Sequence, residues 1–237
     1  MQIKILYDNQ SVYPDIKCGW GFSCLLGDNI LFDTGEDAKA FEHNAKNLNV
    51  DTMRIQHVVI SHDHWDHTGA LWWLLEKIPE AFVYAGRNFS KDFQNQLGFT
   101  DADIIFPEGR QEIQQNIFVI GEMRGQYKKS NISEQAIVIK TNKGLFVITG
   151  CAHPGIIEVI KRIKSLFLGE PVDFVLGGFH LLHSPEEEIE KVVNEFKALG
   201  VKRVAPTHCS GDKAREIFQK VYRENYIPIG AGSVLEA

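Results

Sequence analysis

Residues 62–67 place five potential metal donors close together, in the order His62-Asp63-His64-Trp65-Asp66-His67. The segment directly follows the apolar run 57–61, which predicts a strand that ends at this point. Neutral imidazoles donate lone pairs to cations such as zinc, and an aspartate adds charge that raises the affinity. A solvated polar loop tolerates histidine and aspartate but does not need this density. The cluster therefore predicts a metal site.

Other histidines also follow strand-like runs farther along the chain. The four histidines placed in this way are His62, His153, His180 and His208. In layered α/β proteins, ligands gather at strand ends and in the loops after them. Since the chain contains only nine histidines, this placement indicates one shared site. His43 and His57 lack it, and we assign them to surface and strand-edge roles.

The elements that must position these residues are marked by short apolar runs between turns. Strands are predicted at Ile3–Tyr7, Phe22–Leu26, Ile30–Phe32, Val58–Ser61, Phe82–Ala85, Ile117–Gly121, Ala136–Lys140, Leu145–Thr149, Phe174–Leu176 and Val201–Ala205. Helices are predicted at Gly69–Ile78, after Pro154 as far as about Phe167, at Pro185–Leu199 and at Asp212–Tyr222. Phe89, Phe93 and Phe99 are expected to be core residues rather than part of the site. Because no stretch resembles a linker, we expect a single domain over residues 1–237.

Composition and charge exclude several classes of protein. Hydrophobic residues make up 44% and charged residues 24% of the chain, which is ordinary for a globular protein. The net charge of −6 is spread along the sequence, so a nucleic-acid partner is not expected. The most basic stretch contains Arg124, Lys128 and Lys129. It is expected to be a solvated face, with contact to a phosphate as the alternative.

Targeting and redox features point to the cytoplasm. The segment 1–8 contains Lys4 and lacks the apolar core and small-residue cleavage site of a signal peptide. No run approaches the length of a membrane span, so no membrane partner is expected. The four cysteines have neither CxxC spacing nor the density of a disulfide scaffold. A reducing cytoplasmic location follows from this usage.

Taken in order, these motifs resemble those of the metallo-β-lactamase superfamily over nearly the whole chain. Residues 62–67 match the His-x-His-x-Asp-His motif, His153 matches the later single histidine, and His208 matches the terminal-region histidine. The segment 31–35, Leu-Phe-Asp-Thr-Gly, is similar to the family's buried aspartate turn, which supports the metal loop without binding metal. The Gly-Gly-Phe-His, Cys-Ala-His-Pro-Gly and Thr-His-Cys-Ser-Gly segments are similar to the dihydropteroate-synthase-like subgroup. That subgroup includes archaeal 7,8-dihydropterin-6-methyl-4-(β-D-ribofuranosyl)-aminobenzene-5′-phosphate synthase.

The resemblance implies an α/β fold in which four layers form an αββα sandwich with two metal ions between the sheet edges. It assigns the first ion to His62, His64 and His153. It assigns the second ion to Asp66, His67 and His208. The implied cofactors are two divalent metal ions, with zinc favoured and iron or manganese as alternatives.

Two segments depart from the family pattern. Many members carry a bridging aspartate in a Gly-Asp pair, where this chain has Gly177-Gly178-Phe179-His180. Asp173 begins the same strand, about 20 Å away at about 3.3 Å per residue, so it cannot substitute. His180 is therefore expected either to bind a metal or to act as an acid or base. The second departure is the segment 18–24, which replaces the subgroup's His-Gly-Leu-Ser turn. The resemblance therefore does not imply that this chain acts on the subgroup's substrate.

These residues predict a dinuclear metal-dependent hydrolase that cleaves an ester, lactone or phosphoester bond with a metal-activated water. Asp66 would orient the water as well as bind metal, and His180 would protonate the leaving group. The partner is a small-molecule substrate that could carry a phosphate. One alternative is a pterin transferase like the synthases of the subgroup. A further alternative is a di-iron redox protein or a non-catalytic metal-binding protein.

Overall fold

Two sheets, each with its own buried apolar cluster, divide the chain into two units. The computed structural model describes residues 1–128 and 130–237. The first unit contains Met1–Glu108 and Ile229–Ala237, and the second contains Gly109–Pro228. Because the apolar clusters of the two units share no residue, each unit is described by itself. The single domain over 1–237 stays a prediction.

The first unit is built on a seven-stranded sheet in the order β15-β1-β2-β3-β4-β5-β6. Its strands β15, β1, β2 and β3 pair antiparallel, whereas β3, β4, β5 and β6 pair parallel. The strands are β1 (Gln2–Tyr7), β2 (Ser23–Leu26), β3 (Ile30–Phe32), β4 (His57–Val59), β5 (Phe82–Tyr84), β6 (Asp103–Ile105) and β15 (Val234–Glu236). The parallel half matters for the site, since the carboxyl ends of β3 and β4 meet at one edge.

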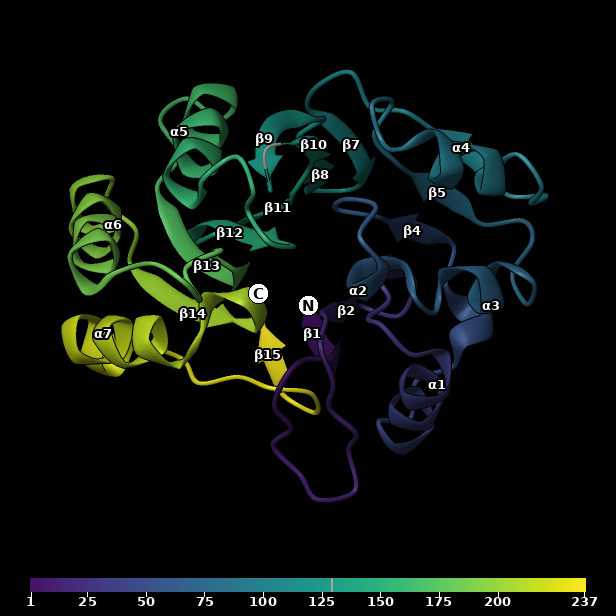
Figure 1. Ribbon diagram of the computed structural model, residues 1–237, viewed down its shortest axis with the longest axis horizontal. Coiled ribbons are helices and arrows are strands. Elements are labelled where there is room, and N and C mark those ends of the chain that lie inside the picture. Colours follow the sequence, from purple (N-terminus) through teal and green to yellow (C-terminus); the bar gives the residue numbers. More distant parts are fainter. Residues whose placement is uncertain (129) are drawn as a thin grey trace. The chain divides into compact units, whose positions relative to one another are not determined.

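Except for the short helix at Trp65–Thr68, the helices of the first unit lie along one side of this sheet (Figure 1). The α-helices of this unit are α1 (Ala38–Asn47), α2 (Trp65–Thr68), α3 (Leu71–Leu75) and α4 (Lys91–Leu97). Their apolar side chains join the strands in one core, to which Phe41, Leu71 and Phe93 belong. Phe89 is also buried, as predicted, but Phe99 is 91% exposed and its assignment to the core was wrong.

The helix predicted over 69–78 is shorter in the structure and is separated from α2 by Gly69 and Ala70. The amides of these two residues do not point along a continuous helix. Gly69 N donates to the Gly35 carbonyl at 2.8 Å, and Ala70 N donates to Thr34 Oγ1 at 3.2 Å. A Cβ at Gly69 would lie 2.0 Å from the Glu36 carbonyl oxygen. The helix is therefore interrupted because its backbone is tied to the turn 34–36.

The second unit contains a six-stranded sheet in the order β14-β13-β12-β11-β8-β7 and a separate hairpin of β9 and β10. The three strands β12, β13 and β14 are parallel neighbours, and the remaining pairs are antiparallel. The strands are β7 (Gln111–Gln114), β8 (Ile117–Val119), β9 (Met123–Tyr127), β10 (Ser130–Glu134), β11 (Ile137–Thr141), β12 (Gly144–Thr149), β13 (Val172–Gly178) and β14 (Arg203–Thr207). The predicted turn between residues 140 and 145 is confirmed, because Thr141 pairs with Gly144.

Three helices cover one side of this second sheet (Figure 1). They are α5 (Ile156–Leu166), α6 (Glu186–Ala198) and α7 (Asp212–Tyr222). The first turn of α6 carries Glu186, Glu187 and Glu188, which favour the positive end of the helix dipole. Phe179, Phe196 and Phe218 meet in the core beneath these helices, with ring centroids 5.2–5.4 Å apart. The predicted bounds of α7 are confirmed.

Among the residues that the structure describes, no helix has both the length and the apolar character needed to cross a bilayer.

Candidate metal centre

A buried aspartate joins two strand ends in the first unit. Asp33 follows β3 and is fully buried. Its Oδ1 accepts the Ser61 amide at 2.7 Å, and its Oδ2 accepts the Ser61 hydroxyl at 2.7 Å. The same Oδ2 lies 2.7 Å from His67 Nδ1. Burial raises the pKa of Asp33, while His67 and Ser61 oppose that rise. The turn that the sequence resemblance predicted therefore holds the segment 61–67 through hydrogen bonds.

The side chains of 62–67 converge within this unit. His62 Nε2 lies 3.1 Å from His64 Nδ1, and the rings of His62 and His67 have centroids 4.2 Å apart. His67 Nε2 in turn lies 3.8 Å from Asp66 Oδ2. Local folding explains this arrangement, since His64 precedes α2 with an extended backbone while Asp66 and His67 lie inside it. All four predicted donors of the cluster are thus brought together.

Three parallel strands bring the later histidines to one edge of the second unit. His153, His180 and His208 follow β12, β13 and β14, which are neighbours in the sheet. The ring centroids of His153 and His180 are 4.5 Å apart. Ligand atoms of Cys151, His153 and His180 all lie within 4.8 Å of one another. The three strand ends are therefore neighbours at one edge of this unit, and a site shared by their histidines stays a prediction.

Glu134 orients His153, and the sequence analysis did not identify it. This glutamate ends β10 and is 3% exposed. Its carboxylate accepts the backbone amides of Cys151, Ala152 and His153 at 2.7–2.8 Å, and its Oε2 lies 2.9 Å from His153 Nδ1. Burial would raise the pKa of Glu134, but His153 and these amides hold that pKa below its ordinary value.

The neighbourhood of His180 and His208 is held by backbone contacts. The amides of Leu181 and Leu182 both donate to the Cys209 carbonyl at 3.1 Å. A hydrogen bond with the Cys209 side chain raises the pKa of His180, and burial opposes that change. Burial alone would raise the pKa of the Cys209 thiol, but the contact with Cys151 and the nearby histidines hold it well below its ordinary value.

Left-handed backbone conformations recur at these strand ends. Asp33, Ala152, His180 and His208 have φ angles of 50–59°. Such values are uncommon for residues other than glycine, and they cost free energy that the surrounding structure must supply. Each of the four residues lies immediately beside, or is itself, a proposed ligand or its support. The turns thus place side chains at positions that an ordinary extended chain would not reach.

The residues present fit a divalent metal. In each unit, an outer ring nitrogen is held by an oxygen: His62 Nδ1 by Ser61 Oγ at 2.9 Å, His67 Nδ1 by Asp33, and His153 Nδ1 by Glu134. Metal-binding histidines show this pattern, because the outer hydrogen bond fixes the tautomer and orients the other nitrogen. If these three rings bind a metal, Nε2 is the nitrogen that would bind it. The donor set of imidazoles with a carboxylate suits zinc, iron or manganese.

The segment 177–180, which contains no carboxylate, is tightly packed at Gly178. A Cβ at Gly178 would lie 2.4 Å from the Gly150 carbonyl oxygen and 2.5 Å from Cys209 Sγ. This position therefore has no room for a side chain. Asp173 is at the opposite end of β13, where it pairs with Arg203, in agreement with its exclusion from the site.

The remaining candidates have simpler surroundings. His43 Nε2 lies 2.8 Å from the Asp15 carbonyl oxygen, which fits a surface role. His57 lies in β4 and stacks on Phe82 at 5.5 Å, which fits a strand-edge role. The Lys128 ammonium lies over the Tyr127 ring at 5.0 Å, and Lys129 is outside the described residues.

Comparisons with known proteins identify the family and agree with the fold. A family model for the metallo-beta-lactamase superfamily matches residues 25–208. The chain is 29% identical to the 7,8-dihydropterin-6-methyl-4-(beta-D-ribofuranosyl)-aminobenzene-5'-phosphate synthase of Methanocaldococcus jannaschii, over 87% of this chain and 84% of that protein. It is 31% identical to the solved structure of Tm1679, a metal-dependent hydrolase of the beta-lactamase superfamily. That match covers 100% of this chain and 99% of the other, with a TM-score of 0.83.

A more distant solved structure extends the agreement in fold. YhfI from Bacillus subtilis, a metallo-beta-lactamase fold protein, is 15% identical and matches with a TM-score of 0.72 over 99% of both chains. At this identity the match concerns the fold alone. Together, the matches confirm the predicted α/β fold of the metallo-β-lactamase type.

Proposed function

Because the chain belongs to the metallo-β-lactamase superfamily, we propose that it is a metal-dependent hydrolase of an ester, lactone or phosphoester. The observation that carries this proposal is the support of three imidazoles by Ser61, Asp33 and Glu134. Metal-binding histidines characteristically place the ring nitrogen that does not bind metal against a carboxylate or another oxygen, as these three do. The similarity to Tm1679, a metal-dependent hydrolase, supports the same reading.

We assign two divalent ions to the site on the strength of the family motifs. His62, His64 and His153 are the proposed ligands of one ion. Asp66, His67 and His208 are the proposed ligands of the other, and zinc is the favoured metal, with iron or manganese as alternatives. When bound, such ions lower the pKa of a water and polarise a carbonyl or phosphoryl oxygen.

The chain itself would supply orientation and proton transfer. The Asp66 carboxylate is placed beside His67 Nε2, where it could accept a hydrogen bond from an attacking water. His180 is exposed, and its pKa is raised by the Cys209 side chain. An imidazole with a raised pKa is protonated over more of the physiological range, so it suits donation of a proton to a leaving group. His180 therefore remains a candidate acid, with metal binding as the other role.

A pterin transferase is the second candidate, and the similarity to the archaeal synthase favours it. Such a reaction would transfer a pterin from its pyrophosphate ester to a ribosyl-aminobenzene phosphate, with release of pyrophosphate and a proton. A phosphorylated substrate would need cationic contacts, for which Arg124 and Lys128 on the β9–β10 hairpin are available. Both residues belong to the second unit, as do Glu134 and His180.

Elemental analysis and a substrate panel test the proposal together. We expect close to two equivalents of metal in the purified protein and turnover of at least one phosphodiester, phosphomonoester, lactone or thioester. A parallel assay with a pterin pyrophosphate donor tests the transferase. Product there, with no turnover of simple esters, would replace the hydrolase proposal. Bound iron with a visible absorbance would instead favour a redox role.

The role of His180 needs a separate test. In His180→Ala, retained metal with lost turnover would assign acid–base work to the imidazole. Loss of one metal equivalent would make it a ligand. Unchanged metal content and unchanged turnover would remove His180 from the site.

A further inference from the structure

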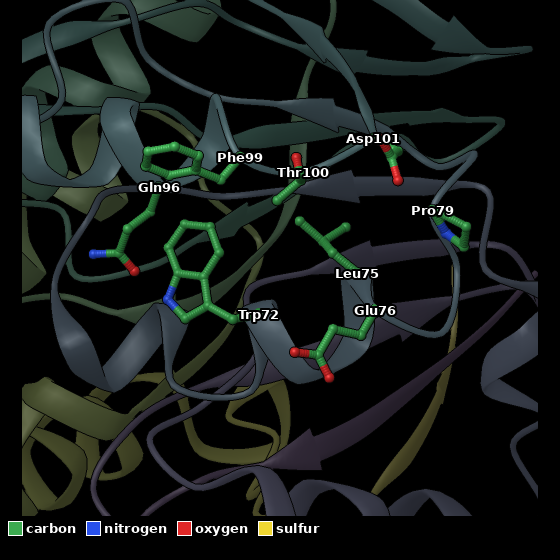
Figure 2. A pocket seen from close by; sticks show the side chains of 8 residues that line it. All are labelled: Trp72, Leu75, Glu76, Pro79, Gln96, Phe99, Thr100 and Asp101. Atoms are coloured by element: carbon green, nitrogen blue, oxygen red, sulfur yellow. The ribbon is translucent and has the colours of Figure 1, made fainter.

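Two hollows adjoin each other in the first unit, beside α3 and α4. They share the side chains of Trp72 and Gln96. The first hollow has a volume of 420 Å³, and Figure 2 shows Leu75 in its middle with Trp72 and Phe99 on one side. The second has a volume of 350 Å³ and is lined by Asp63 and by residues of α2 and α4. The pair thus forms an extended depression that starts next to the loop 62–67.

Aromatic rings form much of the wall. Trp72 and Phe93 pack together with ring centroids 5.4 Å apart, which anchors one face of the depression. Trp65 is 62% exposed and Phe99 is 91% exposed. Side chains as exposed as these contribute little to the core. Their π-faces are therefore available to a ligand, and such faces attract cations.

The charges along this depression are all negative. Its carboxylates are Glu36, Asp63, Glu76, Asp92 and Asp101. None of the residues that line either hollow is a lysine, arginine or histidine. Within the described part of the chain, Glu76 and Asp101 take part in no ion pair. Like charges without a counterion repel one another, so a cationic ligand would relieve this repulsion.

The spacing of the carboxylates favours an extended cation over a metal ion. Asp63 and Asp92 line one hollow, whereas Glu76 and Asp101 line the other. Among the described residues, the groups of donors that come within 4.8 Å of one another include none of these four. A compact ion needs converging oxygens. A chain with several separated cationic groups does not.

We propose that this double hollow binds a linear polyamine, independently of the hydrolase site. The ammonium groups would lie against the carboxylates of the two hollows, and the methylene segments between them would cover Trp72 and Phe99. Such a ligand alternates charge with apolar surface, as the walls do. Each ammonium would gain an ion pair, and the methylene segments would gain apolar contact with the rings.

Calorimetric titration with spermine tests the proposal on the purified protein, residues 1–237. The test variant is the double substitution Glu76→Gln with Asp101→Asn. The control is Glu190→Gln with Glu216→Gln, two exposed carboxylates on α6 and α7 that make the same change in net charge. We expect the test variant to bind spermine about tenfold more weakly and the control to bind within about twofold of the wild type.

The substitution Phe99→Ala provides a second test of the proposal, independent of the carboxylates. Because this side chain is 91% exposed, its removal leaves the core intact, and we expect spermine affinity to fall several-fold. Tetraethylene glycol, which is neutral and of comparable length, should give no binding heat.

Failure of spermine to bind the wild type would overturn the proposal. Equal weakening in the test and control doubles would also overturn it, since attraction would then come from net charge alone. Neither result bears on hydrolysis, which the substrate panel measures separately.

Discussion

At the scale of single residues, two histidines of the loop 62–67 have hydrogen-bond partners that fix the orientation of their rings. Asp33 and Ser61 fix the rings of His67 and His62 from outside the cluster. We predict that His62→Ala and His67→Ala each lose most of the bound metal and any hydrolase activity while the protein stays folded. Metal content is measured by elemental analysis, and folding by circular dichroism.

His43→Ala is the matched control for these variants, because His43 contacts a backbone carbonyl away from the cluster. It should keep its metal and activity. Unchanged metal in both His62→Ala and His67→Ala would show that the ligand assignment is wrong.

Glu134 gives the second prediction at this scale. Glu134→Gln has the same shape but loses the charge that accepts three amides and faces His153 Nδ1. Loss of such an outer partner costs about 10–100-fold in metal affinity. A competition titration with a coloured chelator measures that change, with Glu190→Gln as the exposed control. An affinity equal to that of the wild type would mean that Glu134 only braces the loop 151–153.

At the scale of elements, close approach of strands and turns in the second unit depends on Gly178. A Cβ there would meet Gly150 and Cys209 at 2.4–2.5 Å. We predict that Gly178→Ala destabilises the protein by about 1–3 kcal/mol, the range typical of overpacking. Urea unfolding measures this loss.

Gly109→Ala is the control for that substitution, since a Cβ at Gly109 would meet no atom within 4 Å. Its effect should be near zero or slightly stabilising. Equal stability of the two variants would show that β13 and the turn 208–210 can separate without cost.

His57 on β4 is expected to make the stability of the protein depend on pH. Burial lowers the pKa of His57 in the folded protein, so the unfolded chain binds the proton more readily below the ordinary pKa of about 6.5. Protonation of His57 therefore does not affect the free energy of unfolding above pH 6.5. That free energy falls as the pH decreases from about 6.5 towards the lower pKa of His57 in the folded protein. We predict that His57→Gln loses less stability than the wild type between pH 7.5 and pH 5.5. Urea midpoints at both pH values measure this, and identical slopes would rule the effect out.

Local signals in the sequence predicted most of the candidate ligands, and the family resemblance predicted the supporting Asp33 turn, but Glu134 and two local features of the fold were not predicted. Apolar runs that end at His62, His153, His180 and His208 marked the strand ends, because side chain and backbone preferences there are local. Helix α1 was not predicted, since its residues are mostly polar and its N-cap, Asp37, is a single local signal. The break at Gly69 depends on contacts with residues 34–36, more than thirty positions away.

Glu134 shows why a residue that orients a histidine through hydrogen bonds is hard to predict from the sequence. In the chain it is one polar residue at the end of a polar strand, Ser130–Glu134. Its role arises only when residues 151–153 fold over it, and their amides belong to another turn. No spacing or composition marks that pairing.

At the scale of the whole molecule, the proposed ligands come from both units of the chain. Ions that bind the folded state alone add about 3 kcal/mol to stability when free metal is about a hundredfold above Kd. We predict that a chelator lowers the melting temperature by several degrees and that added zinc restores it. Differential scanning calorimetry measures both changes. An unchanged melting temperature in protein shown to have lost its metal would contradict the proposed ligand sets.

The last strand, β15, belongs to the first unit, although the whole second unit precedes it along the chain. On the ribosome, β1 is therefore made before β15. The two strands cannot pair while residues 109–228 are made, a delay on the order of ten seconds. During that time the edge of β1 can pair with strands of other nascent chains. The protein is thus exposed to misassembly during synthesis at a place that its finished structure covers.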